Sequence, residues 1–229
     1  MCIINNTYGF VFVHIPKCGG TSLTFALSHL NYYRDLEIGS TTYGEELNKI
    51  FGKRYGIWKH SQAREIRNIL GQVTWSKYYT FSIVRNPYAR TMSTYAYLKH
   101  HDDAYTFMKK FASFSEFLRS DEWASSGPDR MFEPQVAWFV DAHKTNIVTD
   151  IFHLEDIQDN LQSIGERLGL APHQVSKLEF PHRNKIRNDP HGHDGIRDED
   201  LDLIYRRYKV DFDTFGYSSN VAVKTGEEA

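Results

Sequence analysis

A run of apolar residues near the start of the chain breaks into a turn with two adjacent glycines: Phe10-Val11-Phe12-Val13-His14-Ile15-Pro16-Lys17-Cys18-Gly19-Gly20-Thr21-Ser22-Leu23. Apolar residues then recur at helical spacing, so the pattern predicts a strand over about Gly9–His14, a tight loop, and a helix over Thr21–Leu30. The backbone N–H groups of such a loop converge on an anion, and the positive end of the helix adds to the attraction. The sequence therefore predicts a phosphate-binding loop.

The lysine of this loop stands before the glycines. A nucleoside-triphosphatase loop has the order G-x-x-x-x-G-K-[ST], in which lysine and hydroxyl open the helix and the hydroxyl holds magnesium. Here the order is Lys17, Gly19, Gly20, Thr21, Ser22. This order indicates a different phosphate ligand and a site without a metal.

Three further apolar runs predict strands, at Tyr55–His60, Tyr78–Val84 and Asn146–Leu154. Helical patterns lie between and after them, at Ser61–Leu70, Tyr88–His100, Phe114–Arg119, Asp129–Val140, Asp156–Leu168 and Arg197–Lys209. Strands that alternate with helices predict a parallel sheet whose faces are covered. We therefore expect an α/β fold, a three-layer P-loop-like domain with a central parallel sheet flanked by helices.

Length and composition limit the classes of protein. The 229 residues suit a single domain over residues 1–217, followed by a tail over residues 218–229 that lacks apolar periodicity and is expected to be disordered. Lys and Arg number 27 against 29 Asp and Glu, a net charge of −2, so no overall positive field favours a nucleic acid partner. The sequence does not indicate an oligomeric state.

The cysteines and the N-terminus bear on the compartment. Cys2 and Cys18 are too few for a disulfide framework, which favours a reducing environment. No run of about 18 apolar residues occurs, and no basic segment precedes an apolar one at the N-terminus. We therefore expect a cytoplasmic protein without a membrane span.

A second motif follows the strand predicted at Tyr78–Val84. Arg85 would lie at the carboxyl edge of the sheet, where ligands of open α/β folds bind. Asn86 and Pro87 are a capping residue and a first helical residue, so a helix should start there. Ser93 would lie two turns into that helix. Arg85 and Ser93 are therefore candidates for binding a second phosphate.

The two motifs together resemble those of sulfotransferases that use 3′-phosphoadenosine 5′-phosphosulfate (PAPS). The blocks are His14-Ile15-Pro16-Lys17-x-Gly19-Gly20-Thr21-Ser22 and Val84-Arg85-Asn86-Pro87-Tyr88-x-Arg90-x-x-Ser93-x-Tyr95. They are similar to the carbohydrate-type branch, which includes Golgi-like and bacterial family 2 enzymes. The resemblance extends from about Phe10 to Tyr217 through Lys59-His60-Ser61, Pro134-Gln135 and Asp211-Phe212-x-x-Phe215-Gly216-Tyr217.

The resemblance implies transfer of a sulfuryl group from PAPS to a hydroxyl or amine of a glycan or small-molecule acceptor, with 3′-phosphoadenosine 5′-phosphate (PAP) as product. Lys17 would stabilise the leaving phosphate as its negative charge grows, and His60 would be the general base. The 5′-phosphate would be held by Lys17, Cys18, Gly19, Gly20, Thr21 and Ser22, and the 3′-phosphate by Arg85 and Ser93.

Several residues keep alternative interpretations. His60 could instead cap a helix or pack in the interior, while His14 is interpreted as a core histidine that braces the loop, and Arg90 as a surface or ion-pair contact. The basic side chains at 182, 183, 185 and 187 could fold over the phosphosulfate, grip an anionic acceptor, or be solvated. Two long connections, Gly39–Phe51 and His100–Phe132, are expected to select the acceptor.

Two other functions fit parts of the pattern. One is a nucleoside-triphosphate-dependent kinase of the same fold, although the sequence has no Gly-Lys-Ser/Thr order and its nearest magnesium-binding candidate, Asp150, comes early in its strand. The other is a non-catalytic nucleotide-binding protein that has kept the loop. The presence of both Lys17 and His60 favours an enzyme.

Overall fold

The computed structural model describes residues 2–181 and 196–219, which form two compact units. The described residues of the first, the sheet unit, are 2–85 and 137–181. Those of the second, the helical unit, are 86–136 and 196–219. The single domain expected over residues 1–217 stays a prediction. The basic segment 182–187 and residues 220–229 of the expected tail lie outside the described residues.

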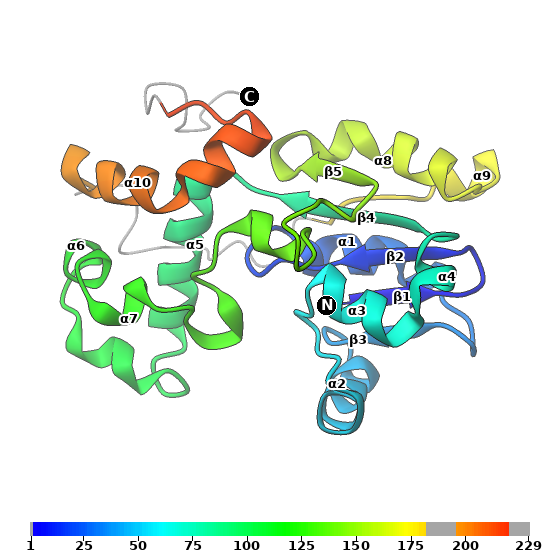
Figure 1. Cartoon of the computed structure of the whole chain (residues 1–229), viewed down its shortest axis with the longest axis horizontal. Coiled ribbons are helices and arrows are strands. Elements are labelled where there is room, and N and C mark those ends of the chain that lie inside the picture. Colours follow the sequence, from blue (N-terminus) through cyan, green and yellow to red (C-terminus); the bar gives the residue numbers. More distant parts are fainter. Residues whose placement is uncertain (1, 182–195, 220–229) are drawn as a thin grey trace. The chain divides into compact units, whose positions relative to one another are not determined.

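The sheet unit contains five described strands in the order β3-β1-β2-β4-β5 (Figure 1). Their bounds are Cys2–Asn5 for β1, Phe10–Val13 for β2, Leu36–Ile38 for β3, Tyr79–Val84 for β4 and Asp150–His153 for β5. Strands β2, β4 and β5 run parallel, with Val13 opposite Ser82. Strand β1 is antiparallel to both β2 and β3.

The sheet is therefore mixed, and the expected central parallel sheet is right only for β2, β4 and β5. The strand predicted over Tyr55–His60 is wrong. Helix α2, Thr42–Tyr55, spans most of the connection expected over Gly39–Phe51. Gly56 ends this helix in the left-handed conformation. Gly44 and Gly52 weaken its helical pattern, but Thr41 caps it by accepting the Gly44 N–H at 3.0 Å.

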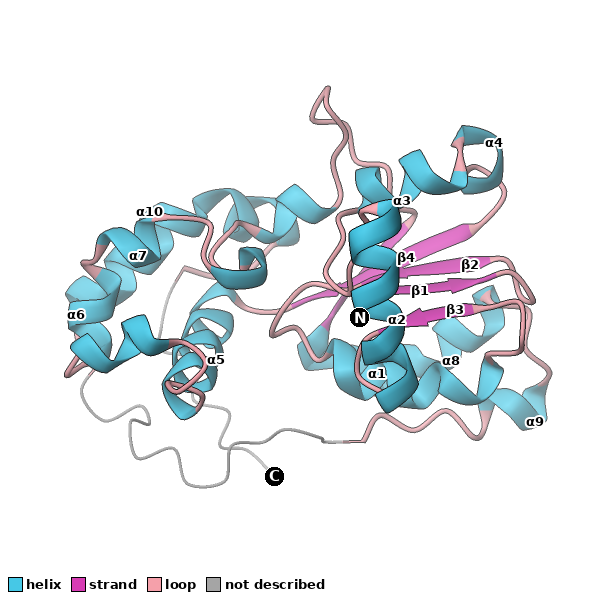
Figure 2. Cartoon of the chain, turned by 90° about the horizontal axis from the view of Figure 1, so that it is seen from below, coloured by secondary structure: helices cyan, strands magenta, loops and turns pink. Residues whose placement is uncertain are grey.

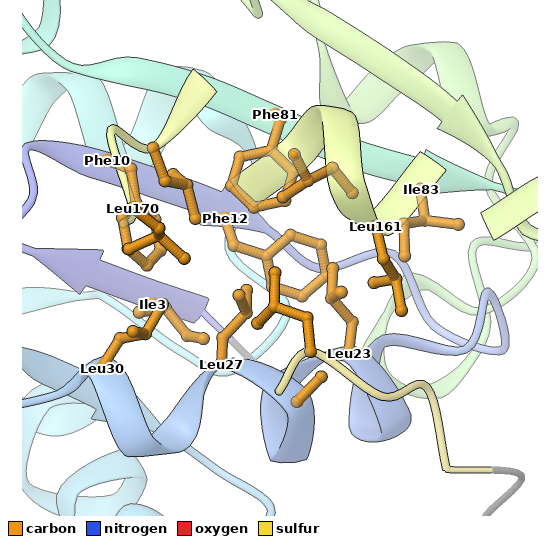
Figure 3. Close-up of a cluster of buried hydrophobic side chains, with 14 of the residues drawn as sticks. Ile3, Phe10, Phe12, Leu23, Leu27, Leu30, Phe81, Ile83, Leu161 and Leu170 are labelled. Carbon is orange, nitrogen blue, oxygen red and sulfur yellow. The ribbon is translucent and has the colours of Figure 1, made fainter. Parts of the chain in front are cut away.

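Helices cover both faces of the sheet (Figure 2). On one face, α1 (Gly20–Leu27) and α8 (Ile157–Arg167) bury a cluster centred on the rings of Phe10, Phe12 and Phe81 (Figure 3). Ile3 joins this cluster, whereas its neighbour Ile4 faces a pocket lined from α2 and α3 (Ala63–Leu70). The alternation along β1 therefore supports the expected three layers within this unit. The short elements α4 (Gln72–Trp75), α9 (Pro172–Val175), η1 (Ser28–Leu30) and η5 (Leu154–Asp156) complete it.

The helical unit is built on α5 (Pro87–His100) and α10 (Asp198–Phe215), which pack against each other (Figure 1). Asn86 caps α5 by accepting the Tyr88 N–H at 3.0 Å, as its sequence predicts. Helix α10 bends at Tyr208 and runs six residues beyond the predicted end. The shorter elements are α6 (Phe114–Leu118), α7 (Asp121–Ala124), η2 (Thr106–Lys110) and η3 (Pro128–Arg130).

The other helical predictions agree with α1 followed by η1, and with α3, α6 and α8, whose bounds shift by a few residues. The helix predicted over Asp129–Val140 is wrong. Two short 3₁₀ turns, η3 and η4 (Gln135–Trp138), stand there because Pro134 cannot donate a helical hydrogen bond. Among the described helices, none is both long and apolar enough to cross a membrane.

The closing Asp211–Tyr217 motif has a structural role in the helical unit. The buried Asp211 carboxylate accepts the backbone N–H groups of Gln135 at 2.8 Å and Val136 at 3.0 Å. Replacing Asp211 with Ala would leave both donors without this acceptor, so we expect the free energy of unfolding to fall by about 3 kcal/mol in chemical denaturation. The exposed Asp213 pairs with Lys209, and Asp213→Ala should change the free energy of unfolding by less than about 1 kcal/mol. Equal losses in the two variants would contradict this role.

Candidate functional site

The loop between β2 and α1 turns twice through the left-handed conformation. Lys17 has φ +67° and Gly19 has φ +71°, and Gly20 is the first residue of α1. The Cys18 N–H donates to the Ile15 carbonyl at 3.4 Å, which closes the first turn. The first amides of an α-helix have no acceptor within the helix, and Gly19 has no side chain to cap them. The loop therefore presents the positive end of α1, as the sequence predicts.

Both glycines of the loop are tightly surrounded. A Cβ on Gly19 would lie 2.4 Å from Leu154 Cδ1 and 3.1 Å from Phe180 Cζ. A Cβ on Gly20 would lie 1.8 Å from Cδ2 and 2.2 Å from Nε2 of His14. His14 is buried and its ring stacks on Phe12, so it braces the loop as expected.

Gly20→Ala should therefore destabilise the sheet unit. The new methyl group would overlap a buried ring, and overpacking of this kind costs about 1–3 kcal/mol. We expect a lower midpoint in chemical denaturation, and partial recovery when His14→Ala is added, because the double variant removes the overlap. An unchanged midpoint in Gly20→Ala would show that the His14 ring yields freely.

Arg85 follows the carboxyl end of β4, directly beside the loop after β2. Since the two strands are parallel and Val13 is opposite Ser82, Arg85 and Lys17 leave the same edge of the sheet. Arg85 Nη1 donates to the Lys17 carbonyl at 3.4 Å. The structure thus brings together two of the predicted phosphate-binding residues.

The ammonium of Lys17 lies in an unusual electrostatic environment. Burial, the main cause, and the positive charge of Arg85 lower its pKa from 10.5 to about 8, while Cys18 opposes them. Two cations held close together at the positive end of a helix favour an anion beside them. The site therefore suits a ligand with more than one negative charge.

His60 lies near this loop but not on a strand. It belongs to a turn in which the Ser61 N–H donates to the Trp58 carbonyl at 3.0 Å. Its Nδ1 lies 3.4 Å from the His14 carbonyl, and the two imidazole rings are 4.6 Å apart. His60 therefore lies near the loop, but on this turn instead of at the end of the strand predicted over Tyr55–His60.

Helix α2 holds the His60 turn in place. The Lys59 N–H donates to Asn48 Oδ1 at 2.8 Å, and the Lys59 ammonium lies 3.6 Å from Glu45 Oε1. Sequence reasoning missed this support because it treated Gly39–Phe51 as a connection. The sequence signals that could have revealed this helix are Thr41 as its N-cap and Gly56 as its C-cap.

The remaining predicted residues differ in their surroundings. Cys18 and Ser22 are buried, so Cys18 offers its backbone rather than an exposed thiol, whereas Thr21 is half-buried. Ser93 lies on α5 in the helical unit, and its role at the 3′-phosphate stays a prediction. In the described ranges 2–181 and 196–219, no group of three or more His, Cys, Asp or Glu side chains could hold a metal ion.

Arg90 corrects another expectation, because it is buried rather than at the surface. Its guanidinium donates to the carbonyls of Glu133 at 2.9 Å and Met131 at 3.0 Å within the helical unit. Arg90 therefore fixes the segment before η4. Its place in the second motif does not distinguish it from an arginine that binds a ligand.

Comparisons with known proteins agree with the resemblance. An uncharacterized protein of Archaeoglobus fulgidus is 30% identical over 105 residues, which cover 46% of this chain and 79% of that protein. No solved structure matches the chain. A sequence model described as the sulfotransferase family matches residues 1–218. With this match over nearly the whole length, the chain belongs to the sulfotransferase family.

Proposed function

We propose that this sulfotransferase uses PAPS as donor and transfers the sulfuryl group to a hydroxyl, or an amine, of a carbohydrate or small-molecule acceptor. The observation that carries the proposal is the pairing of Lys17 and Arg85 at adjacent strand ends, next to the start of α1. PAPS would supply a sulfuryl group on a phosphate leaving group. The crowded glycines and the two cations fit such a dianionic group.

In this proposal the loop binds and orients the 5′-phosphosulfate. The backbone amides at the start of α1 hold its oxygens, and Lys17 places its ammonium where charge grows as the bond from sulfur to the phosphate oxygen breaks. Arg85 binds the 3′-phosphate with its guanidinium fork, and Ser93 is the second proposed contact, carried over from the family motif.

His60 removes the proton from the acceptor in this proposal. The His14 carbonyl can only accept a hydrogen bond, so a bond at 3.4 Å requires the proton on Nδ1 of His60. In a neutral ring this leaves Nε2 as the nitrogen that takes a proton. As the acceptor oxygen bonds to sulfur, its proton passes to Nε2, and the imidazolium keeps its bond to His14.

A kinase is the competing enzyme, and the surroundings of Asp150 argue against it. Its carboxylate accepts the Tyr79 hydroxyl at 2.7 Å and lies 3.0 Å from Arg167 Nη1. Asp150 is opposite Phe81 in the sheet, so it begins β5 instead of ending it. Its place and partners are those of a structural carboxylate, whereas a magnesium-binding Asp of a kinase would follow the strand.

Calorimetry with PAP and with ATP plus magnesium tests the proposal. We expect PAP to bind more tightly, and a transfer assay with PAPS and a panel of sugars, phenols and amines to give a sulfated product. Preference for ATP would favour the kinase. Tight PAP binding without transfer to water or any acceptor would favour the non-catalytic protein.

A further inference from the structure

The backbone of Lys17 is held in a conformation that a residue with a side chain seldom adopts. Its φ of +67° lies in the left-handed region, where Cβ crowds the backbone. Such residues persist only where their surroundings fix them, and they gather at functional sites. Something in the sheet unit must therefore hold this peptide.

Arg85 provides a contact to that strained residue. Its Nη1 donates to the Lys17 carbonyl at 3.4 Å, and β4 carries it to the edge where the loop begins. The guanidinium group is planar, positively charged and rich in N–H donors. It can therefore hold the Lys17 carbonyl and act on the Lys17 ammonium at the same time.

We propose that Arg85 is a positioning residue for Lys17. In this role Arg85 couples the proposed 3′-phosphate site to the lysine that faces the 5′-phosphosulfate. This inference rests on the proposed function and gives Arg85 a role beyond phosphate binding. A phosphate on Arg85 would offset its charge. The Lys17 ammonium would then hold its proton more firmly once the donor is in place.

The charges around Lys17 set the direction of this coupling. Burial contributes most to the low pKa of Lys17, the positive charge of Arg85 from the end of β4 adds to it, and neighbouring Cys18 opposes both. Removing the Arg85 charge should therefore raise the pKa of Lys17 from about 8 toward 10.5. A lysine far from Arg85 would show no such change.

The first test needs no nucleotide. Lysine side chains labelled for NMR are titrated in the wild type, in Arg85→Gln, and in Arg85→Lys, which keeps the positive charge. The Lys17 resonance, assigned by its loss in Lys17→Met, should titrate at higher pH in Arg85→Gln and near the wild-type pH in Arg85→Lys. Unchanged titration in Arg85→Gln would overturn the inference.

The second test separates positioning from phosphate binding. Calorimetry at pH 7 compares PAP with adenosine 5′-monophosphate (AMP), which has no 3′-phosphate for Arg85 to bind. Arg85→Lys should weaken AMP binding by about two- to tenfold, the range for one hydrogen bond. If Arg85 serves only the 3′-phosphate, this variant will weaken PAP binding and leave AMP binding unchanged, and the inference is wrong.

Both tests use a control variant and a check of folding. Arg64 is exposed on α3, and Arg64→Gln should leave both affinities and the lysine titration as in the wild type. Circular dichroism establishes that each variant is folded. Because the titration needs no nucleotide, it decides the role of Arg85 even if PAP binds no better than AMP, a result that counts against the proposed function.

Discussion

Replacing Lys17 with Met should lower the rate of sulfuryl transfer by about 10²–10³, the loss typical of removing one donor to a developing anion. Methionine has nearly the same length but no charge, so the loop keeps its bulk while the leaving phosphate loses its cation. The rate is measured with PAPS and any acceptor found active. Circular dichroism must show the same fold as in the wild type.

Lys53 is the matched control for this change. It is exposed in the last turn of α2, so Lys53→Met removes the same charge from the same unit without touching the loop. We expect its rate to equal that of the wild type. A rate for Lys17→Met close to that of Lys53→Met would mean that Lys17 does not support the leaving group.

The pH dependence of the rate should reveal the same lysine. The ammonium, which is the active form, loses its proton as the pH rises through about 8. The value of kcat/KM for PAPS reports the free enzyme, so it should fall about tenfold per pH unit above that point. Lys17→Arg should lack this fall because a guanidinium keeps its charge. A wild-type profile that stays flat to pH 10 would contradict the assignment.

The parts of the site that follow one another in the chain could be predicted from the sequence. The turn from β2 into α1, and the step from β4 through Asn86 into α5, are local patterns in which glycine, proline and a cap mark the boundaries. Parallel pairing of β2 with β4 then brings Lys17 and Arg85 together. Their proximity follows from the order of the strands.

The parts that depend on tertiary packing could not be predicted in the same way. Strands β1 and β3 have four and three residues, too short for a period to show, and they make the sheet mixed. The position of His60 beside the loop depends on such packing, because its turn is held by the Asn48 side chain from α2. Arg90 has the sequence context of a ligand residue, yet its guanidinium binds backbone carbonyls.

Replacing His60 should have the second large effect, a loss of about 10²–10⁴ in transfer to a hydroxyl acceptor. His60→Ala removes both the base and the contact to His14. His60→Asn is more informative, because its amide N–H can take the place of Nδ1 at the His14 carbonyl while it supplies no proton acceptor at the position of Nε2. If proton removal is the role of His60, both variants lose activity to a similar extent.

Acceptors of different acidity show whether His60 is a general base or has only a structural role. A hydroxyl that ionises easily needs less help in losing its proton, so the loss in His60→Asn should shrink from an alcohol to an acidic phenol. If the ring of His60 only supports the turn and the His14 carbonyl, the loss will be the same for every acceptor and Asn will restore most of it. Near-wild-type transfer to an alcohol by both His60→Ala and His60→Asn would remove His60 from the mechanism and leave Lys17 and Arg85 to act through the donor alone.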